Sequence, residues 1–191
     1  MKLDIILSGV GGQGILSIAA IIGHAALAKG WYIKQAEVHG MSQRGGDVQS
    51  NLRISSEPIA SDLIARGAAD VVISLEPMEA LRYVPYLKAD GAIVSSLLPF
   101  INIATYPDTQ TLINELGAAR EKVILLDIDA LAQEASLTRS ANMILLGAAA
   151  DILGIEYQLL EQGIANVFGS KGQAVVDENI KALGIGHQAA Q

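Results

Sequence analysis

The feature that most constrains the fold of this chain is a glycine-rich segment near its start, Gly9-Val10-Gly11-Gly12-Gln13-Gly14. A short apolar run, residues 3–7, precedes it, and a long apolar stretch, residues 15–28, follows it. This order predicts a central β-strand, a tight turn and an α-helix. Three of the glycines have the spacing G-x-G-x-x-G that joins strand to helix in nucleotide-binding folds, namely Gly9, Gly11 and Gly14.

Such a turn can bind an anionic group. Glycine permits positive φ and a close approach of the backbone, and the first N–H groups of the helix point at the ligand together with the positive end of the helix dipole. The candidate cofactor-binding residues are therefore Gly9, Gly11, Gly12, Gln13 and Gly14. The alternative is a turn that only lets the helix pack closely on the strand.

The remaining apolar runs indicate an α/β fold. The runs 71–73 and 123–126 are continuous, as expected of parallel strands covered on both faces. Residues 48–54 alternate between apolar and polar side chains, which predicts a half-exposed strand that is antiparallel or at the edge. We predict a doubly wound, mainly parallel sheet with helices on both faces, in a single domain spanning 1–191.

The last third of the chain is predicted to be helical. Residues 139–153 are apolar nearly all round, so at least two faces of this helix should be covered, one by the sheet and the other by a partner chain. Residues 157–168 and 173–183 predict two further amphipathic helices. The tail 184–191 has little to pack and is expected to be loose.

Composition excludes several classes of function. The net charge of −7 argues against a nucleic-acid surface. With no cysteine, the chain has no disulfide, no thiol nucleophile and no cysteine-ligated iron–sulfur cluster of its own. The start of the chain lacks a signal-peptide pattern, and no apolar run spans a membrane without interruption. We expect a cytoplasmic protein.

A polar, glycine-rich segment, residues 39–47, follows the second predicted strand. Open α/β sheets bind ligands at such strand ends. Arg44 offers a planar charged fork for a carboxylate or phosphate, and His39 can titrate near neutral pH, so both are candidates for a catalytic interface. The alternative is a plain connection. Glu37, at the end of the second strand, is where dinucleotide-binding folds place the acid that binds ribose hydroxyls.

The sequence lacks the residue patterns expected of a complete enzyme. No catalytic triad spacing appears, and the three histidines, His24, His39 and His187, are too scattered to predict a metal site. Asp127 and Asp129 lie at a predicted strand end and helix cap, where a structural role is expected.

The motifs nevertheless resemble a known family, the gamma subunits or domains of 2-oxoacid:ferredoxin oxidoreductases, and within it most closely the beta subunits of indolepyruvate ferredoxin oxidoreductases. Besides the glycine segment, the stretches that carry the resemblance are Glu37 to Gly46, Ser74 to Arg82 and Asn142 to Gly147. The similarity covers nearly the whole chain.

The resemblance implies a Rossmann-like domain that is inactive alone. Thiamine diphosphate and ferredoxin-type iron–sulfur clusters would be on a larger partner subunit, so ferredoxin would be reached indirectly. The reaction would be oxidative decarboxylation of a 2-oxoacid with coenzyme A, and the substrate indolepyruvate or another arylpyruvate.

Other functions stay open. Sister subunits serving pyruvate, branched-chain oxoacids or 2-oxoglutarate share these motifs. The glycine turn and Glu37 also fit a free-standing NAD(P)-dependent oxidoreductase. A third possibility is a scaffold subunit with an empty turn.

Overall fold

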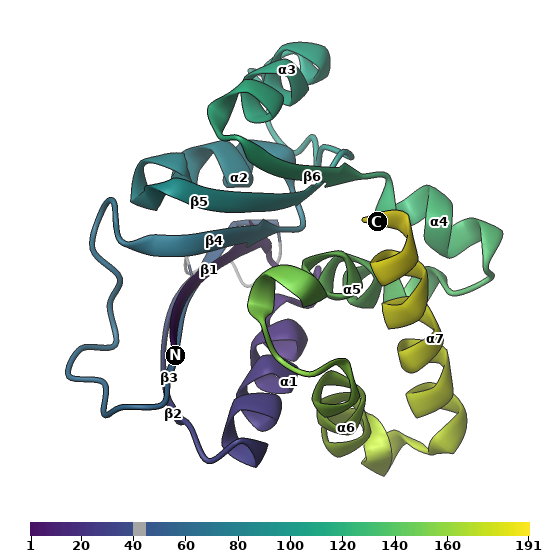
Figure 1. Cartoon of the computed structure of the whole chain (residues 1–191). Coiled ribbons are helices and arrows are strands. Elements are labelled where there is room, and N and C mark those ends of the chain that lie inside the picture. Colours follow the sequence, from purple (N-terminus) through teal and green to yellow (C-terminus); the bar gives the residue numbers. More distant parts are fainter. Residues whose placement is uncertain (40–44) are drawn as a thin grey trace.

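The computed structural model of this chain describes residues 1–39 and 45–191. Its centre is a six-stranded sheet in the order β2-β3-β1-β4-β5-β6 (Figure 1). The strands are β1 (Lys2–Val10), β2 (Tyr32–His39), β3 (Asp47–Ser55), β4 (Ala69–Ser74), β5 (Leu87–Ser96) and β6 (Lys122–Leu126). β1, β4, β5 and β6 are mutually parallel, and β3 runs antiparallel between β1 and β2.

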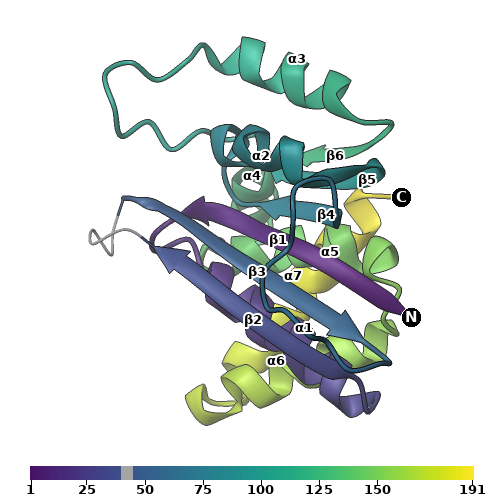
Figure 2. The ribbon, with the colours of Figure 1, turned by 90° about the vertical axis from the view of Figure 1, so that its left-hand side faces the viewer.

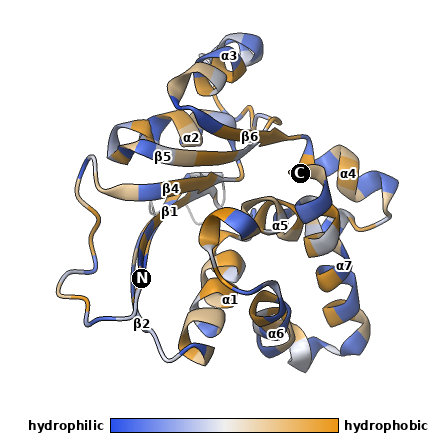
Figure 3. Cartoon of the chain, in the orientation of Figure 1, coloured by the Kyte–Doolittle hydropathy of each residue, from blue (hydrophilic) through white to orange (hydrophobic). Residues whose placement is uncertain are grey.

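Helices cover both faces of the sheet, which confirms the predicted doubly wound class. They are α1 (Ile15–Ala28), α2 (Pro77–Tyr83), α3 (Thr109–Ala119), α4 (Ile128–Glu134), α5 (Ala141–Leu153), α6 (Tyr157–Phe168) and α7 (Gln173–Ala189). Because side chains alternate along a strand, Ile5 and Leu7 pack against the side of α1 and α5, whereas Ile6 packs against the side of α2 and α3. Figure 3 shows hydrophobic residues concentrated on α1, α5 and the central strands.

The direction of winding changes between two neighbouring strands. The chain leaves β1 into α1 on one face, and it leaves β4 into α2 on the other face. Their carboxyl ends therefore open a crevice at the topological switch point, the place where open α/β sheets bind ligands. The predicted antiparallel strand 48–54 is confirmed as β3, which lies inside the sheet rather than at its edge.

Two expectations about the helical region are wrong. The tail 184–191 is not loose, because α7 continues to Ala189. Its close packing on α5 explains this: a Cβ on Gly186 would lie 1.8 Å from the Ile144 carbonyl oxygen, so only glycine permits this approach. α5 also leaves no broad apolar face for a partner chain, since residues 143–150 are all buried and α7 covers the side away from the sheet.

A buried ion pair fastens the segment 56–68 across the face of β1 and β3 that lies opposite α1 (Figure 2). The Asp4 carboxylate is 1% exposed and accepts hydrogen bonds from Arg53 Nε over 2.7 Å and from Arg53 Nη2 over 3.1 Å. Arg53 Nη1 also donates to the carbonyl oxygens of Ser61 and Leu63. Burial alone would raise the pKa of Asp4, but the hydrogen bonds from Arg53 and Lys2 outweigh it, and the pKa is lowered.

Candidate functional site

The glycine turn is fixed by packing at two of its glycines. A Cβ on Gly9 would lie 2.7 Å from Gln13 Oε1, and a Cβ on Gly14 would lie 2.5 Å from Asn142 Nδ2. Gly11 is held by its own N–H, which donates to the Gly46 carbonyl oxygen over 2.9 Å. At Gly12, φ is 103° and no atom lies within 4 Å of an added Cβ. Gly12 thus faces open space.

The Gln13 side chain is engaged with the backbone rather than pointing freely at a ligand. Its Oε1 accepts a hydrogen bond from the Val10 N–H over 2.7 Å, and its Nε2 donates to the Leu75 carbonyl oxygen over 3.1 Å. Gln13 therefore joins the turn after β1 to the end of β4. Among the candidate residues, it sets the shape of the turn.

The start of α1 presents unpaired backbone donors. Within the described part of the chain, no acceptor is bonded to the N–H groups of Gly12, Gly14, Ile15 and Leu16. No side chain caps this helix, and no acidic residue lies in its first turn. The partial positive charge of the helix end is therefore available to an anion.

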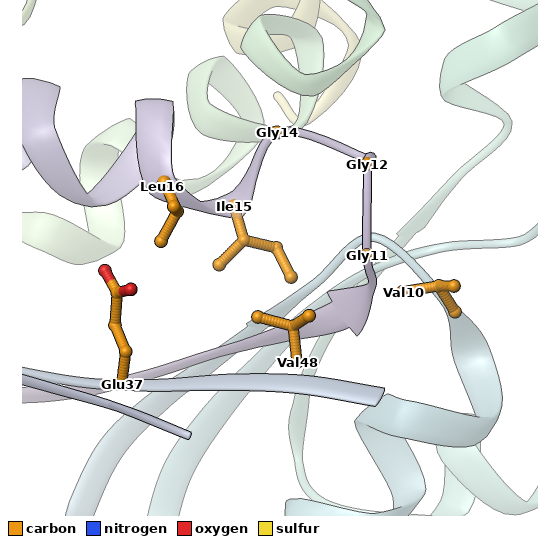
Figure 4. A pocket seen from close by; sticks show the side chains of 8 residues that line it. All are labelled: Val10, Gly11, Gly12, Gly14, Ile15, Leu16, Glu37 and Val48. Carbon is orange, nitrogen blue, oxygen red and sulfur yellow. The ribbon is translucent and has the colours of Figure 1, made fainter. Parts of the chain in front are cut away.

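A first pocket of about 400 Å³ lies between the glycine turn, α1 and the ends of β2 and β3. Its lining is Val10, Gly11, Gly12, Gly14, Ile15, Leu16, Glu37 and Val48. Figure 4 shows the Glu37 carboxylate directed toward Leu16 across this pocket. Gln35 Nε2 donates to Glu37 Oε1 over 2.7 Å and keeps the carboxylate there. Glu37 is the one ionisable group among these lining residues.

A second pocket of about 410 Å³ lies on the other side of the turn, and Gly12 lines both. It sits at the carboxyl ends of β1, β4, β5 and β6, so it occupies the crevice at the switch point. The polar side chains that line it are Gln13, Asp129, Thr138, Arg139 and Asn142. This pocket therefore combines a guanidinium group, an amide and a carboxylate.

Arg139 is the functional candidate that the sequence analysis did not identify. It lies in the 3₁₀ turn Thr138–Ser140 that leads into α5, and its side chain is exposed. No ion pair joins it to any residue that the structure describes. A basic residue just before an apolar helix was the available signal, but such a residue is usually only solvated.

Asp129 also has a different position from the one expected. Asp127, not Asp129, caps α4, by accepting a hydrogen bond from the Ala130 N–H over 2.9 Å. Asp129 is thereby left to line the second pocket. Burial and the neighbouring Asp127 raise the pKa of Asp129.

One wall of the second pocket is a segment held in place by a buried glutamate. Leu98, Pro99 and Phe100 form that wall, just after β5. Glu76 is 1% exposed, and its Oε1 accepts hydrogen bonds from the Phe100 N–H and the Tyr106 hydroxyl. Its Oε2 accepts from the Glu79 N–H and so caps α2. One carboxylate thus fixes both α2 and the pocket wall.

The two candidates in the polar segment are only partly located. His39 is the last residue of β2, where its backbone pairs with Val48. Arg44 lies outside the described residues. The described chain resumes at Gly45 and Gly46, whose backbones hydrogen-bond to Gly11. His39 and Gly45, the described residues on either side of the gap, therefore both lie near the glycine turn. The roles of His39 and Arg44 stay predictions.

Within residues 1–39 and 45–191, no three histidine or acidic side chains come together as metal ligands would. None of the helices in these ranges combines the length and the apolar character needed to cross a bilayer.

The sheet order, the switch point and the open turn define a Rossmann-like α/β protein. Residues 4–189 match the family model described as pyruvate ferredoxin/flavodoxin oxidoreductase, and the chain belongs to this family. The resemblance seen in the sequence motifs is thereby confirmed.

A curated relative agrees with this membership, and a solved structure shares the fold. The chain is 36% identical to the indolepyruvate oxidoreductase subunit IorB of Archaeoglobus fulgidus, over 100% of this chain and 96% of that protein. Its fold is similar to that of the gamma subunit of a keto/oxoacid ferredoxin oxidoreductase from Geobacter sulfurreducens, with a TM-score of 0.73, 23% identity and 98% of each chain covered.

A larger protein contains the same fold as one part. The 2-oxoglutarate:ferredoxin oxidoreductase of Magnetococcus marinus, solved with 2-oxoglutarate, coenzyme A and succinyl-CoA bound, superposes with a TM-score of 0.77 at 24% identity. The match covers 99% of this chain but 31% of that one. The present fold is therefore about a third of a larger polypeptide in that enzyme.

Proposed function

We propose that this chain is the cluster-free subunit of a ferredoxin-dependent indolepyruvate or arylpyruvate oxidoreductase and works only with a larger partner. The observation that carries the proposal is the 36% identity, over the whole chain, to a protein named as an indolepyruvate oxidoreductase subunit. The absence of cysteine supports this division of labour, since cysteine thiolates hold iron–sulfur clusters. We expect the complex to work in the cytoplasm.

The proposed reaction is the oxidative decarboxylation of a 2-oxoacid. The bond between the carboxylate and the carbonyl carbon breaks, CO₂ leaves, and the sulfur of coenzyme A forms a new bond to the carbonyl carbon. Two electrons go to ferredoxin through the partner's clusters, and the thiol proton goes to solvent. Thiamine diphosphate on the partner would supply carbanion stabilisation. This chain would bind and orient coenzyme A.

The glycine turn is the proposed site for a phosphate of coenzyme A. The N–H groups of Gly12, Gly14, Ile15 and Leu16, which have no acceptor among the described residues, support this assignment. Four unpaired donors beside the N-terminus of a helix favour an oxyanion over a neutral group. Arg44 and His39 are proposed to lie at the interface with the partner, where Arg44 would assist a carboxylate or phosphate.

The partner is proposed to cover the carboxyl edge of the sheet, because the thiol of coenzyme A must reach a cofactor on that subunit. Several large apolar side chains are exposed at this edge, in the segment that walls the second pocket. They are Leu98 at 39%, Phe100 at 44%, Ile101 at 68% and Ile103 at 46% exposure. This apolar segment supports a contact with the larger subunit, in place of the α5 face that the sequence suggested.

A second candidate function is a free-standing NAD(P)-dependent oxidoreductase. One observation favours it: Glu37 lines the first pocket beside the turn, where a ribose would lie in a dinucleotide-binding fold. This reading predicts that the chain alone binds a nicotinamide cofactor. The scaffold alternative predicts that coenzyme A kinetics do not depend on the turn.

Reconstitution tests the proposed function. The chain is purified alone and co-expressed with its large partner, and each preparation is assayed for reduction of ferredoxin with indolepyruvate and coenzyme A. We expect activity only in the complex, with pyruvate, branched-chain oxoacids and 2-oxoglutarate as weaker substrates. Oxoacid oxidation by the chain alone, or a complex that prefers another oxoacid, would contradict the corresponding part of the proposal.

A further inference from the structure

The two pockets flanking the glycine turn differ in charge, and coenzyme A is asymmetric in the same way. Besides its pyrophosphate, coenzyme A has a third phosphate on the 3′ oxygen of its adenosine ribose. If the pyrophosphate binds at the turn, as the proposed function has it, two pockets that share Gly12 lie beside it and can take the phosphorylated adenosine.

The first pocket is unfavourable for the 3′-phosphate. Glu37 is its one ionisable lining residue among those described. Gln35 Nε2 donates a hydrogen bond to the Glu37 carboxylate over 2.7 Å. A fixed carboxylate suits a ribose with free hydroxyls, because it accepts their hydrogen bonds. A phosphate in the same place would be repelled by the like charge.

The second pocket offers the complementary group. Arg139 lines it, and no ion pair with a described residue occupies its guanidinium. A guanidinium can donate two parallel hydrogen bonds to a phosphate. Asn142 stands in the same wall, with its amide donating to the Gly14 carbonyl oxygen over 3.3 Å.

The pocket also contains a carboxylate, Asp129, which does not pair with Arg139. A carboxylate can accept a hydrogen bond from the adenine amino group or the ribose 2′-hydroxyl. At about 410 Å³ the cavity is within the usual range for ligand sites, roughly 300–1,000 Å³. The second pocket thus has a charged donor for the phosphate and an acceptor for the nucleoside.

We propose that the adenosine end of coenzyme A binds in the second pocket with its 3′-phosphate on Arg139, and not in the first pocket beside Glu37. Arg139 then determines the preference for coenzyme A over dephospho-coenzyme A. The inference rests on the proposed function, because it takes coenzyme A as the ligand of the turn.

The test compares coenzyme A with dephospho-coenzyme A, which lacks only the 3′-phosphate, in the assembled complex. Arg139→Gln should raise the KM for coenzyme A about ten- to hundred-fold, which is the worth of one charge-assisted contact. The KM for dephospho-coenzyme A should change by less than about twofold, because this ligand lacks the phosphate that makes the charge-assisted contact. Arg139→Lys should retain part of the preference, and size-exclusion chromatography checks that each variant complex assembles.

Glu37→Gln provides the matched control on the other side of the turn. It removes the charge of the first pocket, and the ratio of the two KM values should stay as in the wild type. If Arg139→Gln affects both ligands equally or neither, or if Glu37→Gln selectively lowers the KM for coenzyme A, the proposed orientation is wrong. Gly12→Asp separates the two levels of inference: if it too leaves coenzyme A kinetics unchanged, the turn is not the coenzyme A site at all.

Discussion

The side-chain amide of Asn142 donates a hydrogen bond to the carbonyl oxygen of Gly14 over 3.3 Å, across 128 positions of sequence. This contact joins the start of α5 to the start of α1. It also closes the wall between the glycine turn and the second pocket, which Asn142 lines. The shape of the turn therefore depends on the C-terminal helices as well as on its own glycines.

Because of this contact, we expect two glycine substitutions to lower the free energy of unfolding by different amounts. Gly12→Ala and Gly14→Ala both place a side chain at positive φ, 103° and 92°, which costs about 1–3 kcal/mol. Only at Gly14 would the new Cβ also displace Asn142 and break its hydrogen bond, worth about 1 kcal/mol more. Urea unfolding measures the difference. Equal losses in the two variants would show that the Asn142 contact has no energetic role.

A pH dependence is expected from Asp4 and Arg53. The folded-state pKa of Asp4 is lowered, so its interactions stabilise the protein above about pH 4, near the unfolded value, and this contribution is lost as the pH falls through the folded pKa. Arg53→Gln leaves the buried carboxylate with Lys2, whose side chain is largely exposed, as its remaining charged partner among the described residues, and should cost about 3 kcal/mol at pH 7.

In that variant, the hydrogen bonds of Arg53 no longer offset burial, so the pKa of Asp4 rises. Acid then protonates the carboxyl group and relieves the loss of unfolding free energy. The difference in unfolding free energy between wild type and variant should therefore shrink between pH 7 and pH 3. Lys2→Gln, which removes the exposed partner of Asp4, is the control and should cost about 1 kcal/mol or less. If the difference in unfolding free energy between wild type and Arg53→Gln is the same at pH 7 and pH 3, Asp4 is not its source.

The apolar segment after β5 gives a prediction about assembly. Ile101→Asp puts a charge on its most exposed apolar side chain and should weaken binding of the large subunit about tenfold or more. Leu63→Asp is the matched control, because Leu63 is 58% exposed in the segment 56–68. Analytical ultracentrifugation of the mixed subunits measures both. If the two variants assemble equally well, this edge does not contact the partner.

Arg44 is predicted to act through the shape of its guanidinium as well as its charge. Arg44→Lys keeps the charge but loses the planar fork, so activity of the complex should fall about ten- to hundred-fold while assembly persists. Steady-state kinetics with indolepyruvate and coenzyme A measure the effect. Unchanged kinetics in Arg44→Ala would mean that the segment is only a connection.

The first half of the fold could be predicted from local pattern. The apolar run before the glycine segment and the helix after it identify β1 and α1, and alternation over 48–54 identifies the antiparallel β3. These signals lie within a few residues of the element that they predict. The continuous apolar runs 71–73 and 123–126 identify the parallel strands β4 and β6, and with these the doubly wound sheet could be predicted.

The errors concern contacts between distant parts of the chain. The tail 184–191 was expected to be loose because it has little to pack, yet Gly186 is what allows α7 to pack against Ile144. The same packing covers α5 and removes the face expected for a partner. Arg139 was missed because it is a candidate only through its place in the second pocket. That pocket is formed by the ends of four strands and by α5, and no local sequence pattern reveals it.

The central claim is that the open position of the glycine turn faces a phosphate of coenzyme A. Its most direct test is the dissociation constant of coenzyme A for the assembled complex, measured by calorimetry in Gly12→Asp and Gly12→Asn. The two side chains are nearly equal in size and both stand at φ 103°, so they differ mainly in charge. We predict at least about tenfold weaker binding to the aspartate variant, with a gap that narrows at high salt. Equal dissociation constants in the two variants would contradict the claim.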